Sequence, residues 1–323
     1  MTRAVDAEDD RSPWGSLSRH PLLLSSAGAA LLGFTGLLFR ESGTSPATAT
    51  TFRFLYALPL LLALAAYERR AGRSWRGSRT AAWTAGVMIA ADLVLWLRSV
   101  DDIGAGLATV LGNVQLVFVI LASAALLGER LSRPLVGGVI AMSLGVVLIS
   151  GALQSHAYGS DPGAGALLSV AAGLLYGAYI MLLRRASDGR PSVLPLTHAT
   201  VAGALSAVLL GVCFGQLDPA PAWHAQAWLV LLALSNQVLA WLLLTVPASL
   251  LPASTTSLVL TLQPVAGLLV GVILLSEHPN GLQLVGVVAL VAGFFVALRS
   301  RQHASAASRA PLAAIPSAPG EVR

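Results

Sequence analysis

Apolar runs of about twenty residues, separated by short polar turns, follow one another along almost the whole chain. A helix of this length crosses the hydrocarbon core of a bilayer, so the pattern predicts an all-α polytopic membrane protein with ten transmembrane helices. The expected helices run approximately over residues 22–39, 47–67, 81–100, 105–127, 134–151, 164–183, 193–214, 227–246, 253–275 and 282–298.

One stretch of the pattern occurs twice. Residues 104–148 return 148 positions later without a gap, which aligns Gln115 with Gln263. A period near half the chain is too long for a solenoid and indicates two homologous halves. We therefore expect a cytoplasmic tail at 1–20, a first repeat at 21–152, a second repeat at 163–298 and a disordered cytoplasmic tail at 299–323.

The arginines predict how the helices insert. All basic residues are arginines, and the loops at 154–163, 216–224 and 278–283 contain none, with Arg40 as the exception on that side. Positive charge is retained in the cytoplasm, so both termini are predicted to lie there, in the cell membrane. The arginines on the predicted cytoplasmic side are Arg3, Arg11, Arg19, Arg69, Arg70, Arg73, Arg76, Arg79, Arg130, Arg133, Arg184, Arg185, Arg190, Arg299, Arg301, Arg309 and Arg323.

The odd number of helices in each half predicts inverted repeats. The turn after Glu129 carries Arg130 and Arg133, whereas the equivalent turn after Glu277 carries no arginine. Five helices per half place these two turns on opposite sides of the membrane. Both glutamates lie at helix ends beside polar turns, so we expect interfacial acids and not intramembrane proton sites.

Composition supports this class and excludes others. The chain is 55% hydrophobic and 11% charged, against roughly 25% charged residues in soluble domains. The arginines lie between apolar runs, which argues against a nucleic-acid partner. One cysteine, Cys213, allows no internal disulfide or thiolate cluster. Phosphate-loop, HExxH and GxSxG motifs are absent from the sequence, so we expect no enzyme, cofactor or metal.

The repeated motif resembles a known family. A mid-helix glutamine precedes a glutamate by fourteen residues, in GNVQLVFVILASAALLGERLS and in LTLQPVAGLLVGVILLSEHPN, and Arg53 opens the second helix in TFRFLYALPLLL. This pattern is similar to the EamA repeat of the drug/metabolite transporter superfamily. The resemblance implies a ten-helix secondary transporter that moves amino acids, other metabolites or drugs, usually outward. Leu116 replaces the family's proline in the first copy, and Ser276 replaces its glycine before Glu277.

Asp92 is the first candidate for chemistry within the membrane. A charged side chain there is costly and marks function or pairing. Trp96 and Ser99 follow at i+4 and i+7 on the same helical face. The repeat equivalent of Asp92 is Ala240, so Asp92 breaks the internal symmetry and is a candidate proton or cation carrier. The alternative is a structural ion pair with Arg53.

Arg53 has two interpretations of its own. Its guanidinium can bind an anionic group of a substrate, such as a carboxylate. It can equally be half of a structural or gating ion pair, which we prefer, or reach outward to the membrane interface. Arg98 has Asp101 and Asp102 at i+3 and i+4, so a local solvated pair is expected.

Polar and aromatic side chains in four further helices complete the candidate pathway. Asn113 and Gln115 are about 200° apart around one helix, so one can line a pathway while the other bonds to a neighbouring helix. Pro264 removes a backbone hydrogen bond in mid-helix and predicts a bend near the cavity. The remaining candidates for the substrate or ion pathway are Tyr176, Tyr179, Gln237, Trp241 and Gln263. For the tyrosines the alternative is ordinary helix packing through Gly173 and Gly177.

Small-residue stripes predict where helices pack closely. They are Gly137, Ala141 and Gly145 in the fifth helix, and Gly267 and Gly271 in the ninth.

Together these patterns predict a secondary transporter that exports small organic solutes by alternating access about a central polar site. The simplest driving ion is a proton, because Asp92 is a mid-membrane carboxylate. The expected partners are a small-molecule substrate and the lipid bilayer, and a homodimer is left open. The alternative is a non-transporting membrane scaffold or receptor, which would need a loop or tail long enough to fold with a partner.

Overall fold

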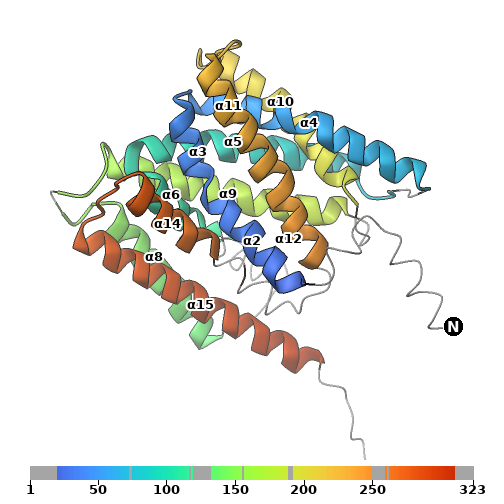
Figure 1. Cartoon of the computed structure of the whole chain (residues 1–323). Coiled ribbons are helices and arrows are strands. Elements are labelled where there is room, and N and C mark those ends of the chain that lie inside the picture. The colour runs from blue at the N-terminus through green and yellow to red at the C-terminus, as the bar shows by residue number, and fades with distance from the viewer. Residues whose placement is uncertain are drawn as a thin grey trace, which may run out of the picture.

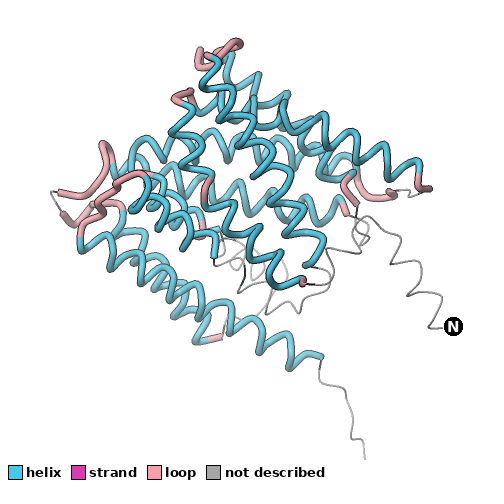
Figure 2. Tube along the Cα trace, in the orientation of Figure 1, coloured by secondary structure: helices cyan, strands magenta, loops and turns pink. Residues whose placement is uncertain are grey.

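The computed structural model describes residues 20–72, 75–115, 118, 132–154, 156–187, 192–248, 259 and 262–309. Within these residues the regular structure is entirely helical, as Figure 2 shows. The two predicted tails up to residue 19 and from residue 310 lie outside the described residues. Parts of the fourth and ninth expected helices, including Leu116, also lie outside the described residues, as does Glu129 in the turn after the fourth helix.

The helices follow the apolar runs (Figure 1). In the first half they are α2 Pro21–Gly33, α3 Thr35–Ser42, α4 Pro46–Arg70, α5 Arg79–Ile103, α6 Ala105–Gly112 and α8 Arg133–Ile149. In the second half they are α9 Pro162–Ala186, α10 Leu194–Cys213, α11 Trp223–Leu232, the π-helix η1 Ala233–Leu239, α12 Ala240–Ala248, α14 Leu262–Leu274 and α15 Gly281–Arg309.

Six spans among the described residues are long and apolar enough to cross a membrane, and three further apolar helices are shorter. The chain is therefore a polytopic membrane protein. One boundary differs clearly from expectation, because α15 continues to Arg309 instead of ending near residue 298. The added segment contains neither glycine nor proline. The next helix breaker is Pro311, which disfavours helical conformation in the residue before it.

Helix packing follows the sequence repeat. Helices at equivalent places in the two halves pack against each other, namely α4 with α10, α6 with α14, and α8 with α15. Two further contacts also have a counterpart in the other half: α5 packs on α9 as α12 packs on α2, and α6 packs on α9 as α14 packs on α2. Exchanging the halves therefore reproduces each of these contacts.

Equivalent helices run antiparallel where they meet. A Cβ atom added at Gly138 in α8 would lie 2.8 Å from the Gly293 carbonyl oxygen, and one at Gly145 would lie 2.7 Å from the Gly286 carbonyl oxygen. Residue numbers thus rise along α8 as they fall along α15, and Figure 1 shows the two helices side by side. Small residues at these positions let the two backbones approach closely.

The other small-residue stripes have mixed outcomes. Gly267 lies against Thr109 and Gly271 against the backbone of Gly106, which confirms the predicted seam and makes α6 and α14 antiparallel as well. In the stripe of the fifth helix, Gly145 is confirmed at the seam with α15, whereas Gly137 was wrongly placed there, because no atom of another described element lies within 4 Å of its Cβ position. At that turn the seam uses Gly138 instead, which faces α15.

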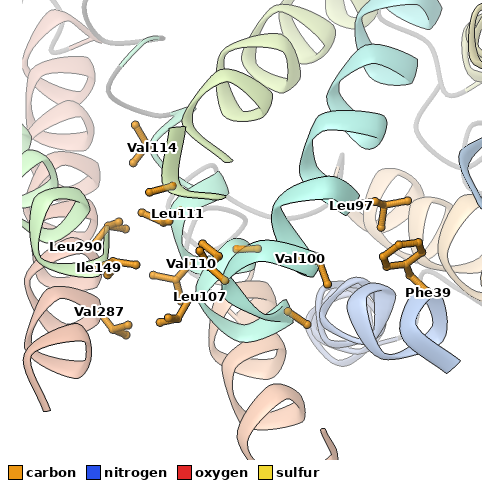
Figure 3. Packing of buried hydrophobic residues seen from close by; sticks show 14 of the residues in the cluster. Phe39, Leu97, Val100, Leu107, Val110, Leu111, Val114, Ile149, Val287 and Leu290 are labelled. Carbon is orange, nitrogen blue, oxygen red and sulfur yellow. The ribbon is translucent and has the colours of Figure 1, made fainter. Parts of the chain in front are cut away.

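The largest hydrophobic core surrounds α6. Figure 3 shows Leu107, Val110 and Leu111 of this helix lying between Ile149, Val287 and Leu290 on one side and Phe39, Leu97 and Val100 on the other. These residues come from α3, α5, α6, α8 and α15, so both repeats contribute to one core.

The loops gather at two ends of the molecule, as the predicted topology requires. At one end, which we call the arginine-poor end, the turn at 43–45 contacts the 215–222 loop, and the 150–161 loop contacts the segment at 275–281. At the opposite, arginine-rich end Trp75 donates to the Ala186 carbonyl at the end of α9, and its ring packs against His198 near the start of α10.

The assigned seam between α8 and α15 predicts how substitutions of glycines in α8 change the stability of the protein. Gly138→Leu should destabilise the protein by about 1–3 kcal/mol, because the side chain has to displace the backbone of α15. Gly137→Leu, on the open face of the same helix, should be neutral or slightly stabilising. Unfolding midpoints of the purified protein in detergent measure both changes. Equal losses for the two variants would contradict the assigned seam.

Candidate functional site

Arg53 is buried in α4 and is held by the other repeat. Its Nε donates a hydrogen bond to Oε1 of Gln237 at 3.0 Å. The Gln237 amide in turn donates from Nε2 to the Thr200 hydroxyl at 3.3 Å, which turns Oε1 toward the guanidinium. A buried charge needs such a partner, since desolvation is otherwise uncompensated. Three helices, α4, α10 and η1, thus meet at one charged group.

Asp92 lies near the middle of α5 and is almost fully buried, with 6% of its surface exposed. Its carboxylate attracts the Arg53 guanidinium electrostatically, but the two groups form no salt bridge within 4.0 Å. The structural ion pair considered from the sequence is therefore not formed. The guanidinium bonds to the neutral Gln237 amide instead, which leaves the Asp92 carboxylate without a direct cationic partner among the described residues.

Aromatic rings lie beside Arg53 and Asp92. Tyr176 and Tyr179 of α9 stack with their ring centroids 5.9 Å apart. Tyr179 meets the edge of Trp241 of α12 at 5.7 Å. Both tyrosines lie near Arg53 and Asp92. Six of the predicted pathway residues are thereby brought into one cluster, which we call the central cluster: Arg53, Asp92, Tyr176, Tyr179, Gln237 and Trp241.

Irregular backbone lies beside the central cluster. Gln237 belongs to η1, and π-helical segments within α-helices occur frequently at functional sites. The neighbouring Asn236 accepts a hydrogen bond from Thr35 at 2.6 Å. Thr35 itself follows the interruption at Phe34 that separates α2 from α3. The interruption between α2 and α3 of the first repeat therefore faces the π-helical segment η1 of the second repeat.

The other predicted pathway residues lie away from the Arg53 contact. Trp96 donates from its indole nitrogen to the Ala108 carbonyl at 3.1 Å, so it joins α5 to α6. Asn113 bonds to the Thr109 carbonyl within its own helix. Gln115 has a buried Oε1 for which the described residues supply no hydrogen-bond partner. Gln263 is half-buried at the start of α14, next to the buried Pro264.

Some polar groups of the site escaped sequence reasoning. Thr200 sits in the α10 run without any motif, and Thr50 precedes Arg53 by one helical turn with a buried, unpartnered hydroxyl. Hydroxyls are common in membrane helices, where they usually bond to their own backbone. The only available signal was their spacing, since Thr50 and Arg53 are three residues apart and share a face.

Glu277, expected from the sequence to be an interfacial acid, is enclosed by protein in the structure. It is fully buried, and its carboxylate accepts hydrogen bonds from the backbone amides of Ala105 at 2.5 Å and Gly106 at 2.9 Å. Arg40, the exception in the arginine pattern, lies 3.7 Å away. The sequence shows only a polar turn, whereas the fold places the start of α6 against it. The expected pair between Arg98 and Asp102 is confirmed at 3.6 Å.

The residue before Glu277 is one of the two departures from the family pattern. Ser276 has a φ of 52°, the left-handed conformation that favours glycine. A glycine at this position would adopt that conformation without steric cost.

The fold and the central cluster define a multi-pass membrane protein with buried charge between two related halves. The model of the EamA-like transporter family matches residues 21–151 and 163–299. These matches cover most of the chain, which therefore belongs to this family of membrane transporters. The family is not an enzyme family, and it implies a small-molecule substrate and a lipid environment.

A solved structure described as "Crystal structure of protein" is similar over 87% of this chain and 98% of its own, with a TM-score of 0.59 and 19% identity. At this identity the likeness shows the fold alone. A search among curated proteins found no match.

The Arg53 contact yields a prediction about stability. Gln237→Ala removes the acceptor of a buried guanidinium and should cost about 2 kcal/mol or more of unfolding free energy. Gln226→Ala is the matched control, because Gln226 accepts only from the neutral Tyr56 hydroxyl and should cost about 1 kcal/mol or less. Thermal unfolding in detergent compares them. A smaller loss for Gln237→Ala would show that Arg53 does not depend on this bond.

Ser276 gives a second prediction. A non-glycine residue in the left-handed region costs about 1–2 kcal/mol, partly offset by the greater backbone entropy that glycine loses on folding. Ser276→Gly should therefore stabilise the protein by about 0.5–1 kcal/mol. Ser143→Gly, at an exposed position inside α8, should destabilise it by about 0.5 kcal/mol. Shifts of the same sign in the two midpoints would refute the strained conformation.

Proposed function

We propose that this protein is a secondary transporter that exports small organic solutes, such as amino acids, other metabolites or drugs. The observation that carries the proposal is the central cluster, in which Arg53 of one repeat is bonded to Gln237 of the other. Buried charges in membrane helices are characteristic of substrate and ion pathways. Membership of a transporter family supports the same conclusion, and the family resemblance favours outward transport.

Alternating access about this cluster would use two inverted five-helix repeats within ten membrane spans. The antiparallel contacts of α8 with α15 and of α6 with α14 support the inversion, because equivalent helices of inverted repeats run in opposite directions. Rocking of one repeat against the other would expose the cluster to each side in turn.

The arginine distribution supports the orientation of the chain in the cell membrane. The arginine-rich end would face the cytoplasm together with both termini. The arginine-poor end, which carries the turn at 43–45 and the 215–222 loop, would then face outward. Export would move a solute from the first end to the second.

In this mechanism Arg53 would attract an anionic group of the solute, while the rings of Tyr176, Tyr179 and Trp241 would bind an apolar part. Asp92 would carry the proton that couples transport to a gradient. Its lack of a salt bridge supports this role, because a carboxylate already paired with arginine would hold a proton weakly.

The experiment first identifies a ligand and then measures its flux. Purified protein is screened for thermal stabilisation by a metabolite library that begins with amino acids, since a ligand that binds the folded state raises stability by mass action. The resulting ligand is then tested in proteoliposomes with an imposed pH gradient. We expect gradient-driven flux in the wild type and its loss in Asp92→Asn, while Asp102→Asn, at the end of α5, retains it.

Flux that ignores the gradient, or that survives Asp92→Asn unchanged, would eliminate proton coupling through Asp92. Binding of a solute without any flux would favour a receptor over a transporter.

A further inference from the structure

Glu277 ties the two repeats together at the arginine-poor end. It belongs to the segment between α14 and α15, whereas the amides that it binds, on Ala105 and Gly106, begin α6 in the first repeat. A carboxylate at a helix N-terminus satisfies amides that have no partner within the helix and is favoured by the helix dipole. The contact therefore joins the repeats by charge as well as by hydrogen bonds.

Glycines make room for this carboxylate. A Cβ atom added at Gly104, whose φ is 89°, would lie 2.7 Å from the Glu277 carboxyl carbon. One added at Gly106 would lie 3.1 Å from Oε2, and one at Gly271 would overlap that oxygen. The pocket around Glu277 is thus shaped by both α6 and α14.

Arg40 extends the contact to two more segments. It lies 3.7 Å from the Glu277 carboxylate and donates from Nη2 to the Val100 carbonyl at 3.3 Å. Its guanidinium also lies near Tyr158, in the loop between the repeats. Burial, followed by the nearby Glu277 charge, raises the pKa of Tyr158, which keeps its hydroxyl protonated.

We propose that the contact between the Glu277 carboxylate and the α6 amides closes a gate between α6 and α14 at the arginine-poor end, and we call this contact the latch. The inference rests on the proposed transport function. In the structure the latch is closed and holds α6 against α14. Opening moves the carboxylate away from the α6 amides and separates the two helices at this end. The side chain of Arg40 is 31% exposed, so water can replace the broken bonds. The glycine seam between α8 and α15 is closed by direct backbone packing, and the hydrogen bond beside it, from Gln283 to the Ile149 carbonyl, is buried.

The test measures whether the latch controls access to the space between α6 and α14. Cys213, the only cysteine, is first replaced by serine. Thr109→Cys then serves as the reporter, since Thr109 lies one turn beyond the latch and packs against Gly267. Its rate of labelling by a hydrophilic maleimide is measured on the full chain in lipid nanodiscs, where both faces are accessible. The control reporter is Ser99→Cys, which lies at the buried contact with Ser169.

Glu277→Gln should speed labelling at position 109 about tenfold or more, and each factor of ten corresponds to 1.4 kcal/mol lost from the closed state. Arg40→Gln should have a smaller effect in the same direction. The matched control is Glu68→Gln, because Glu68 is also buried and also binds a helix N-terminus, at Val193 on the arginine-rich end. It should leave labelling at position 109 unchanged.

An unchanged rate in Glu277→Gln would overturn the latch. Equal acceleration at both reporters, or equal acceleration by Glu68→Gln, would also overturn it, since Glu277 would then stabilise the fold without gating. The labelling needs neither a solute nor a gradient. A failed latch therefore remains distinguishable from a failed transport proposal, which the flux assay decides separately.

Discussion

A guanidinium buried in a helical bundle within lipid must keep a hydrogen-bond acceptor nearby, and much of this structure depends on that requirement. Arg53 finds its acceptor in Gln237 of the other repeat, and Thr200 orients the amide that accepts. The π-helical backbone of η1 presents Gln237 at this point, and aromatic rings from α9 and α12 exclude water around it. Because the partner of the charge is a neutral amide, the Asp92 carboxylate nearby is left available for another ligand or a proton.

Two kinds of contact hold the repeats together, and they suggest different roles. At α8 and α15 the backbones meet through Gly138, Gly145, Gly286 and Gly293, which is a tight apolar seam. At the arginine-poor end the repeats are joined by polar groups around Glu277 that water can replace. Close packing tolerates little displacement without loss of stability, whereas hydrogen bonds to solvent can substitute for those within the protein. A rocking motion would therefore preserve the first contact and break the second.

Much of the architecture was predictable from the sequence, because lipid imposes a strong constraint on helix length and polarity. The apolar runs located the helices, and the 148-residue repeat anticipated the two related halves. Boundaries were less predictable, since the extension of α15 depends on the absence of a breaker and not on hydrophobicity. The clustering of Arg53, Asp92, Tyr176, Tyr179, Gln237 and Trp241 was predicted only as a set of candidates for one pathway.

Specific pairings could not be predicted, because they depend on which helices meet and at what rotation. The sequence offered Asp92 as the partner of Arg53, yet helix rotation directs the guanidinium to Gln237. Glu277 was expected only as an interfacial acid because its neighbours in sequence are polar, while its partners in space are the amides that begin α6. The glycine stripe was right at Gly145 but wrong at Gly137 for the same reason, since Gly137 and Gly138 differ in the direction they face.

The central claim is that the Arg53 cluster is exposed to each side of the membrane in turn. Thr200, which bonds to Gln237, can be replaced by cysteine in a chain that lacks Cys213, and reconstituted in vesicles of known orientation. A membrane-impermeant thiol reagent is then added to one side at a time. The account predicts that the cysteine reacts from both sides and that a bound solute protects it. Reaction from one side only, or from neither, would contradict alternating access.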